Sequence, residues 1–142
     1  MRPGVYMFGD LFQCSIGSCD LDDLALSVLV SVNAWRADEQ RAMVDAGALA
    51  LSLDRGAPDE NGAYAFGMAA DMNGVPLTGR PRIRQVNQEH GFLMGLRDRP
   101  DIGQRLRILP NHACSTAAQY EIYHVIDGNG QIVDRWQRTG GW

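Results

Sequence analysis

The sequence predicts a mainly β domain, an antiparallel β-barrel or sandwich with few short helices. Residues 103–110 alternate apolar and polar side chains, residues 24–35 form a β-branched apolar run, and Asp127-Gly128-Asn129-Gly130 separates two strand-like segments. No repeat, linker or low-complexity block interrupts the 142 residues. We therefore expect a single domain over residues 1–142.

In the first half of the chain, residues 5–8 follow a Pro3-Gly4 turn signal and read as a strand, and residues 14–23 read as a loop. Residues 24–35 are expected to form a core strand with Val28, Val30 and Val32 on one face. The alanine and leucine content of residues 41–52 would suit a helix. Because Gly47 interrupts this segment, we favour a strand, a turn and a second strand.

In the second half, residues 54–79 are rich in Gly, Pro, Asn and Asp and predict a surface loop with a weak hairpin. Residues 82–96 predict two strands that flank a polar Glu89-His90-Gly91 segment. Residues 103–110 predict a strand with Leu106 and Ile108 facing one way, followed by residues 111–114. Residues 121–126 and 131–136 predict a hairpin.

Composition excludes several classes of function. The net charge is −4 and no window is strongly basic, so nucleic acid is not an expected partner. No apolar run approaches the roughly 20 residues that span a bilayer, and three sparse cysteines favour reduced thiols, so a cytoplasmic protein is expected. All thirteen basic residues are arginine, so these 142 residues cannot supply a lysine amine.

His112 and Cys114 are the residues whose types indicate chemistry. In an extended segment their i, i+2 spacing would place both side chains on one face, and imidazole nitrogen with thiolate sulfur suits zinc. Since no second close Cys/His pair completes four ligands, the site would be open, as catalytic zinc sites are. Spacing alone favours the alternative, a loop histidine and a buried cysteine. We read Cys14 and Cys19 as loop cysteines, not as a second metal pair.

Several segments together resemble the D-serine dehydratase and D-threonine aldolase family, in that family's order and over nearly the whole chain. They are Arg2-Pro3-Gly4-Val5-Tyr6 with Asp10, Asp23-Leu24-Ala25-Leu26-Ser27-Val28, residues 44–52, Glu89-His90-Gly91, Leu109-Pro110-Asn111-His112-Ala113-Cys114, and Val133-Asp134-Arg135-Trp136 with Gly140. Two departures, Leu53 in place of a polar or basic residue and the tail over residues 138–142, leave the substrate contacts open.

The resemblance implies that this chain corresponds to the C-terminal β-domain of a two-domain enzyme. The other domain of such enzymes is a β/α barrel whose lysine forms a Schiff base with pyridoxal phosphate. The dehydratase branch binds zinc through a His-x-Cys pair, which falls on His112 and Cys114, whereas the aldolase branch typically has His-x-Asp. The cysteine therefore favours the dehydratase branch.

The resemblance also suggests supporting residues. Glu89 and His90 are candidates for orienting a metal ligand, against the alternative of a polar pair at a strand end. Gly4 and Tyr6 are candidates for contacting the cofactor phosphate, against the alternative of a turn followed by a core tyrosine. Asp45-Ala46-Gly47 is expected to set a backbone turn near the site.

Two functions remain open from the sequence. The chain could be the zinc-bearing part of a lyase that acts on D-serine or a D-threonine-like substrate, with a partner barrel domain or chain and as a homo-oligomer. It could instead be a stand-alone, non-catalytic module that binds a metal or ligand, or a segment of a longer protein. The first function predicts an exposed apolar patch where the barrel would pack.

Overall fold

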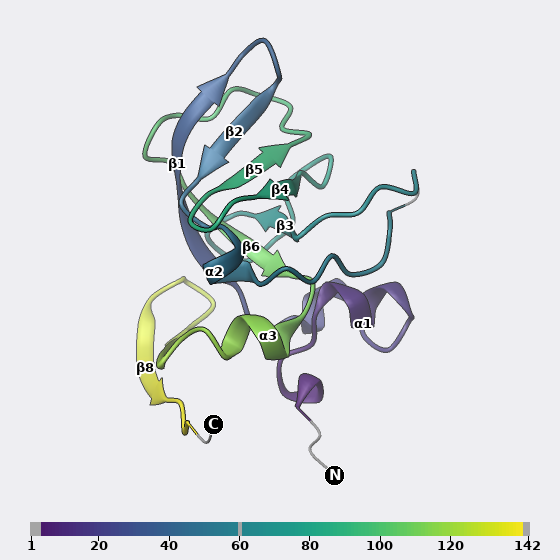
Figure 1. Cartoon of the computed structure of the whole chain (residues 1–142). Helices are drawn as coiled ribbons and strands as arrows, with labels where there is room; N and C mark the ends of the chain where they lie inside the picture. Colours follow the sequence, from purple (N-terminus) through teal and green to yellow (C-terminus); the bar gives the residue numbers. More distant parts are fainter. Residues whose placement is uncertain (1–3, 60, 141–142) are drawn as a thin grey trace.

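A closed antiparallel β-barrel of six strands forms the body of the protein, which confirms the predicted mainly β class (Figure 1). The computed structural model describes residues 4–59 and 61–140. Around the barrel the strands follow the order β1-β2-β5-β4-β3-β6. Their bounds are β1 (Val28–Arg36), β2 (Arg41–Val44), β3 (Gly67–Ala70), β4 (Arg82–Val86), β5 (Gly91–Met94) and β6 (Arg105–Pro110).

The barrel interior is filled by the alternate apolar positions of the strands. Val28, Val30 and Val32 of β1 are buried, as expected, and Val28 lies opposite Ile108 of β6 while Val30 lies opposite Leu106. Because side chains alternate along a strand, this register sends one face of each strand into the core. The buried cluster is completed by Ala42, Val44, Ala46, Leu51, Phe66, Ala69, Ile83 and Leu93.

Short helices gather at one end of the barrel, as Figure 1 shows for α1, α2 and α3. The helical elements are η1 (Val5–Met7), α1 (Leu11–Ser15), η2 (Leu21–Asp23), α2 (Ala48–Leu51) and α3 (Ala113–Ala117). Leu11 of α1 packs with Met68, Ala70 and Leu109 on the outside of β3 and β6. No helix in the described part of the chain is long and apolar enough to cross a membrane.

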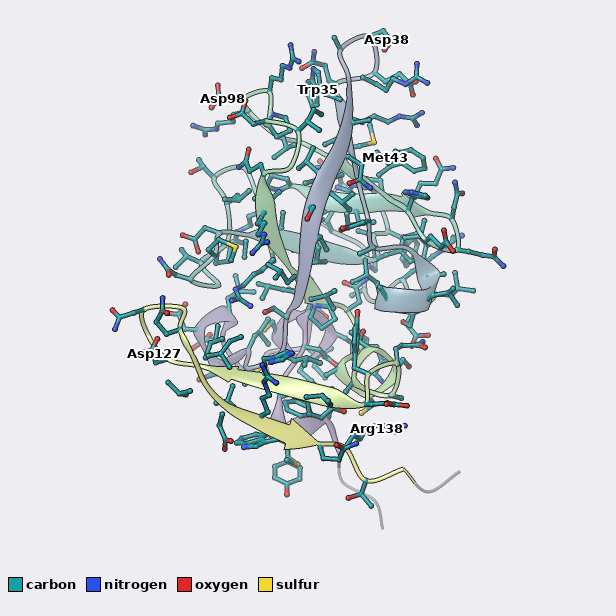
Figure 2. All side chains as sticks on the ribbon, turned by 90° about the vertical axis from the view of Figure 1, so that its left-hand side faces the viewer. Trp35, Asp38, Met43, Asp98, Asp127 and Arg138 are labelled. Carbon is teal, nitrogen blue, oxygen red and sulfur yellow. The ribbon has the colours of Figure 1, made fainter. Side chains whose placement is uncertain are left out.

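A separate two-stranded hairpin, β7 (Ile122–Ile126) with β8 (Ile132–Gln137), lies beyond this end of the barrel (Figure 2). It confirms the hairpin predicted from the Asp127 turn, where the Asp127 carboxylate accepts hydrogen bonds from two backbone N–H groups, of Asn129 and Gln131. These bonds lower the pKa of Asp127. Every residue of β8 is exposed.

The strand expected over residues 5–8 is wrong, because this segment folds as η1. The carbonyl of Val5 accepts hydrogen bonds from the N–H groups of Phe8 and Gly9, at 3.1 and 2.8 Å, which closes a helical turn. Arg2 and Pro3 of the motif, and Gly141 and Trp142 of the tail, lie outside the described residues.

Residues 41–52 are only partly β, because β2 is followed by the short helix α2. The N–H groups of Ala48 and Leu49 bond to the carbonyls of Asn87 and Gln88, at 2.8 and 3.0 Å. The chain bends at Asp45 between β2 and α2, and Gly47 allows this segment to approach the β4–β5 turn, since an added Cβ would lie 2.4 Å from the Asn87 oxygen. The bonds across this contact favour a helix start over a second strand.

Two predicted loops contain more structure than expected. Residues 14–23 include the end of α1 and all of η2, because Asp10 caps α1 through the N–H of Gln13 at 2.9 Å and Asp23 bonds the N–H of Asp20. Within residues 54–79, the part over 65–70 is buried and contains β3. The small residues of β3 pack closely against β6. The segment therefore has few large apolar side chains because it is tightly packed, and not because it is an exposed loop.

Candidate metal site at the end of β6

The predicted ligand pair lies where β6 turns into α3. His112 is the N-cap of α3, with extended backbone angles of −135° and 100°, and Cys114 is already inside the helix. The expectation that both residues lie in one extended segment is therefore wrong. The strand β6 ends at Pro110, and α3 begins three residues later. The N–H of Ala113, the first residue of α3, donates a hydrogen bond to the buried Asp10 carboxylate at 2.9 Å.

Asn111 anchors this corner to the loop that follows α2. Its side chain is buried and its Nδ2 donates hydrogen bonds to the carbonyls of Ala65 and Asp54, the latter at 3.2 Å. Gly56 allows this close packing, since a Cβ there would lie 3.0 Å from Asn111 Cγ and its φ is +65°. The loop carrying Asp54 is thus held against the corner carrying His112.

One carboxylate, that of Asp54, contacts the His112 ring. His112 Nδ1 lies 2.5 Å from Asp54 Oδ2, and Ser115 Oγ donates to the same oxygen at 2.7 Å. Ser115 Oγ also lies 3.1 Å from His112 Nδ1. The hydrogen bond from Ser115, and then that from His112, lower the pKa of Asp54, so this carboxyl is ionised at neutral pH.

Cys114 is exposed beside the N-terminal segment. Gly4 lies directly against it, because a Cβ on Gly4 would be 3.3 Å from Cys114 Sγ. Tyr6, on η1, is 75% exposed, so it is not the core tyrosine of the alternative interpretation. The structure therefore brings Gly4 next to Cys114 of the candidate pair. Contact of Gly4 and Tyr6 with a cofactor phosphate stays a prediction.

Glu89 and His90 lie elsewhere, in the β4–β5 turn. Glu89 borders a shallow pocket with Gly47 and Tyr120, and neither Glu89 nor His90 hydrogen-bonds to His112 or Cys114 within the described residues. Their predicted role in orienting a ligand stays a prediction that no contact supports. Sequence reasoning missed Asp54, which stands 58 residues before His112, and spacing carries no signal over such a separation.

The donor set fits a metal site with two protein ligands. Nδ1 of His112 is engaged, and its Nε2 makes no hydrogen bond to the described residues. Together with the exposed Cys114 thiol it offers one nitrogen and one sulfur, a combination that suits zinc. The described part of the chain contains no cluster of three or more His, Cys, Asp or Glu residues that could hold a metal ion. Further ligands would come from water, substrate or groups outside these residues.

The family follows from comparison with known sequences. Residues 25–126 match the family model described as "Putative serine dehydratase domain". The chain belongs to this family. The serine dehydratase domain thus contains the whole barrel, the His112 corner and β7, and the resemblance on which the ligand pair rests is confirmed.

This chain matches two kinds of relative: longer enzymes, of which it covers a part, and a short protein that it covers almost completely. The chain is 41% identical to D-threo-3-hydroxyaspartate dehydratase of Delftia sp. and 32% identical to D-serine dehydratase of Dictyostelium discoideum, and it covers 39% and 37% of these proteins. It therefore spans about two fifths of the length of both. It is also 31% identical to an uncharacterized protein of Mycobacterium tuberculosis, where it covers 94% of the relative.

Solved structures share this fold over nearly the whole length of the chain. The Delftia dehydratase superposes with a TM-score of 0.84 at 39% identity, over 98% of this chain and 38% of that one. D-threonine aldolase of Filomicrobium marinum superposes with a TM-score of 0.66 at 26% identity, over 96% of this chain and 34% of that one. Two further structures are dehydratase variants, one with a histidine replaced by alanine. The other, with a cysteine two positions later replaced by alanine, is described as metal-free.

Proposed function

We propose that this domain is the metal-binding part of a pyridoxal-phosphate-dependent D-amino-acid lyase of the dehydratase type, with His112 and Cys114 as zinc ligands. The observation that carries the proposal is the His112–Cys114 corner, where Nδ1 of the imidazole is bonded to a carboxylate and Nε2 is left to bind a metal. The variants of the related dehydratase support it, because their substituted histidine and cysteine have the same order and spacing.

The residues of this chain would bind and orient, and the cofactors would supply the reactive centres. When bound, zinc supplies Lewis acidity toward the β-hydroxyl of the substrate, and pyridoxal phosphate supplies an electron sink at the α-carbon. His112 Nε2 and Cys114 Sγ would hold the ion, and the backbone of Gly4 with the Tyr6 phenol would face the cofactor phosphate. The Schiff-base lysine must come from outside these 142 residues, which contain none.

The proposed partner is a β/α barrel domain, in the same protein or in a separate chain, within a homo-oligomer. About three fifths of the related dehydratases lies outside the region that this chain matches. The fully exposed strand β8 presents Ile132, Val133 and Trp136, which is apolar surface that a packed domain would cover. The substrate class would be D-serine or a D-threonine-like β-hydroxy amino acid. The odd and sparse set of three cysteines supports a cytoplasmic setting.

A second function, a stand-alone metal- or ligand-binding module, has one observation in its favour. The relative from Mycobacterium tuberculosis is covered over 94% of its length by this chain, so a protein consisting almost entirely of this domain is known. Such a module would bind zinc without turnover. The two functions share the His112–Cys114 site and differ in whether a barrel completes it.

The first test is zinc content after equilibrium dialysis against zinc, measured by elemental analysis. We expect about one zinc per chain in the wild type and in the control His124→Ala, whose exposed imidazole lies in β7. His112→Ala and Cys114→Ala should both lose it. A wild-type chain that takes up no zinc would overturn the proposal for both functions.

The second test adds a separately expressed β/α barrel domain that carries the Schiff-base lysine and measures formation of pyruvate from D-serine. Turnover that depends on both chains, and that is lost in Cys114→Ala, supports the lyase. A zinc-binding chain that stays inactive with the barrel supports the stand-alone module.

A further inference from the structure

We propose that Asp54, supported by Ser115, is the positioning residue that holds His112 in the tautomer and orientation presenting Nε2 to the metal. The proposal rests on the function proposed above and adds two residues that neither the sequence motifs nor the comparisons assign. It concerns the position of the ligand and not the reacting atoms. Asp54 reaches His112 from the loop after α2, and Ser115 reaches both from α3.

Hydrogen bonds to the Asp54 backbone hold this residue in place beside His112. Its N–H donates to Ser52 Oγ at 3.2 Å, and its carbonyl accepts from the buried Asn111 side chain, also at 3.2 Å. These bonds hold the residue on both sides of its Cα. Ser115, three residues after His112, adds a hydrogen bond to the same carboxylate oxygen that contacts the ring. The carboxylate is therefore fixed before any metal arrives.

The chemistry of the contact decides the tautomer. An ionised carboxylate can only accept a hydrogen bond, so Nδ1 of a neutral His112 must carry the proton. A neutral imidazole has one N–H, which leaves a lone pair on Nε2. A carboxylate bonded to the other ring nitrogen also raises the basicity of a ligating histidine, and loss of such a partner typically weakens metal binding about 10- to 100-fold.

The competing explanation is an ordinary surface ion pair. The two side chains are 45% and 48% exposed, and exposed pairs are worth little on their own. A surface pair would leave the His112 tautomer mixed, and its loss would leave metal affinity unchanged. The two explanations therefore predict different His112 tautomers and different metal affinities after loss of Asp54. They do not predict different free energies of unfolding.

The experiment is long-range ¹H–¹⁵N NMR of the histidine rings in the metal-free chain at about pH 8.5, about two units above the ordinary pKa of an imidazole side chain. The missing signal in His112→Ala assigns the ring. We expect the Nδ1–H tautomer for His112 in the wild type, a shift toward Nε2–H in Asp54→Ala, and no shift in the control Asp98→Ala, an exposed carboxylate on a distant loop. Zinc dissociation constants should rise about 10- to 100-fold in Asp54→Ala and less in Ser115→Ala.

An Nε2–H tautomer in the wild type, or a tautomer unchanged in Asp54→Ala, would overturn the positioning role. The NMR result does not depend on metal binding. If the wild type takes up no zinc, the proposed function fails while the ring nitrogens still decide the role of Asp54.

A different observation carries a second proposal: we infer that Cys14 and Cys19 form a dithiol that closes to an internal disulfide. Their sulfur atoms lie 3.5 Å apart, about 1.5 Å more than a disulfide bond. Cys14 lies in α1, and the turn to Cys19 contains Gly17, around which there is open space. Both cysteines line a cavity of about 250 Å³ that Asn111 also lines. The disulfide would therefore form close to the residue that holds the His112 segment against the loop after α2.

The reaction needs an oxidant, and a small disulfide suffices. Two cysteine S–H bonds break and one S–S bond forms, while the small disulfide accepts two electrons and two protons and leaves as two thiols. Burial raises the pKa of the Cys14 thiol to about 12, with a hydrogen bond to Cys19 as the next cause, so the exchange should be slow at neutral pH.

The test is mass spectrometry, without reductant, of the full chain incubated with oxidised glutathione. We expect Cys114→Ser to lose two hydrogen atoms and to carry no glutathione, and we expect Cys14→Ser to carry glutathione on Cys19. A Cys114→Ser chain with stable glutathione on Cys14 or Cys19 would contradict the inference. A Cys114→Ser chain in which Cys14 and Cys19 both stay free, under conditions that modify Cys114 of the wild type, would also contradict it.

Discussion

Replacing Gly47 by alanine tests the contact that turns the chain from β2 into α2. A Cβ at this position would lie 2.4 Å from the Asn87 oxygen, 2.6 Å from the Gln88 oxygen and 2.6 Å from the His90 nitrogen. All three atoms are backbone, so none can move aside as a flexible side chain could. The β4–β5 turn and the start of α2 must separate to accept one methyl group.

The cost can be worked out from the contacts. Overpacking a close contact costs about 1 to 3 kcal/mol. Separation also weakens the two hydrogen bonds from the N–H groups of Ala48 and Leu49, each worth about 1 kcal/mol. The entropy that alanine removes from the unfolded chain returns about 0.4 to 1 kcal/mol. We expect a net loss of about 3 kcal/mol, or about 10 °C in Tm for a domain of this size.

Urea unfolding of Gly47→Ala beside Gly128→Ala measures this loss. Gly128 lies in the β7–β8 turn with nothing within 4 Å of an added Cβ, so its variant should be as stable as the wild type or up to about 1 kcal/mol more stable. If Gly47→Ala were equally stable with an unchanged m-value, the close approach of the two turns would be refuted.

Three further predictions follow from single contacts. Thr116→Val removes the hydrogen bond that the buried hydroxyl donates to the last carbonyl of α2 at 3.1 Å, and should cost about 1 to 2 kcal/mol in urea unfolding; an unchanged midpoint would contradict it. The Arg84 guanidinium lowers the pKa of Asp59 to about 2, so the stability difference between wild type and Asp59→Asn should be full above about pH 5 and shrink as pH falls toward 2. A difference that grows on acidification would have the wrong sign. Iodoacetamide at about pH 8 should modify the exposed Cys114 first and Cys14 last, because burial raises the Cys14 pKa to about 12; peptide mapping gives the order, and the reverse order would rule out this burial.

Most of the barrel could be predicted from local patterns. The alternation in β6 and the valines of β1 identified buried faces correctly, and the Asp127 turn identified the β7–β8 hairpin. The segments that failed were those whose partners are far away in the chain. The helix α2 depends on carbonyls of the β4–β5 turn, and β3 depends on its pairing with β6, about 40 residues further along the chain.

The candidate site also contains features that the sequence indicated and features that depend on contacts between distant residues. The residue types and order of His112 and Cys114 were evident from the sequence, and family resemblance pointed to them as a ligand pair. His112 and Cys114 do not share one extended segment as predicted, since Cys114 lies in a helix. Asp54 was missed because its contact with His112 joins residues 58 positions apart.

The sequence by itself determined most of the barrel strands, the β7–β8 turn, the family and the candidate ligand pair. These features depend on side-chain alternation, turn chemistry and motif order, which act between neighbours in the chain. Only the tertiary structure decided that the sheet closes, that Asp54 meets His112, and that Gly4 lies against Cys114. These contacts join residues far apart in sequence, and they form only when the whole barrel and its end helices pack together.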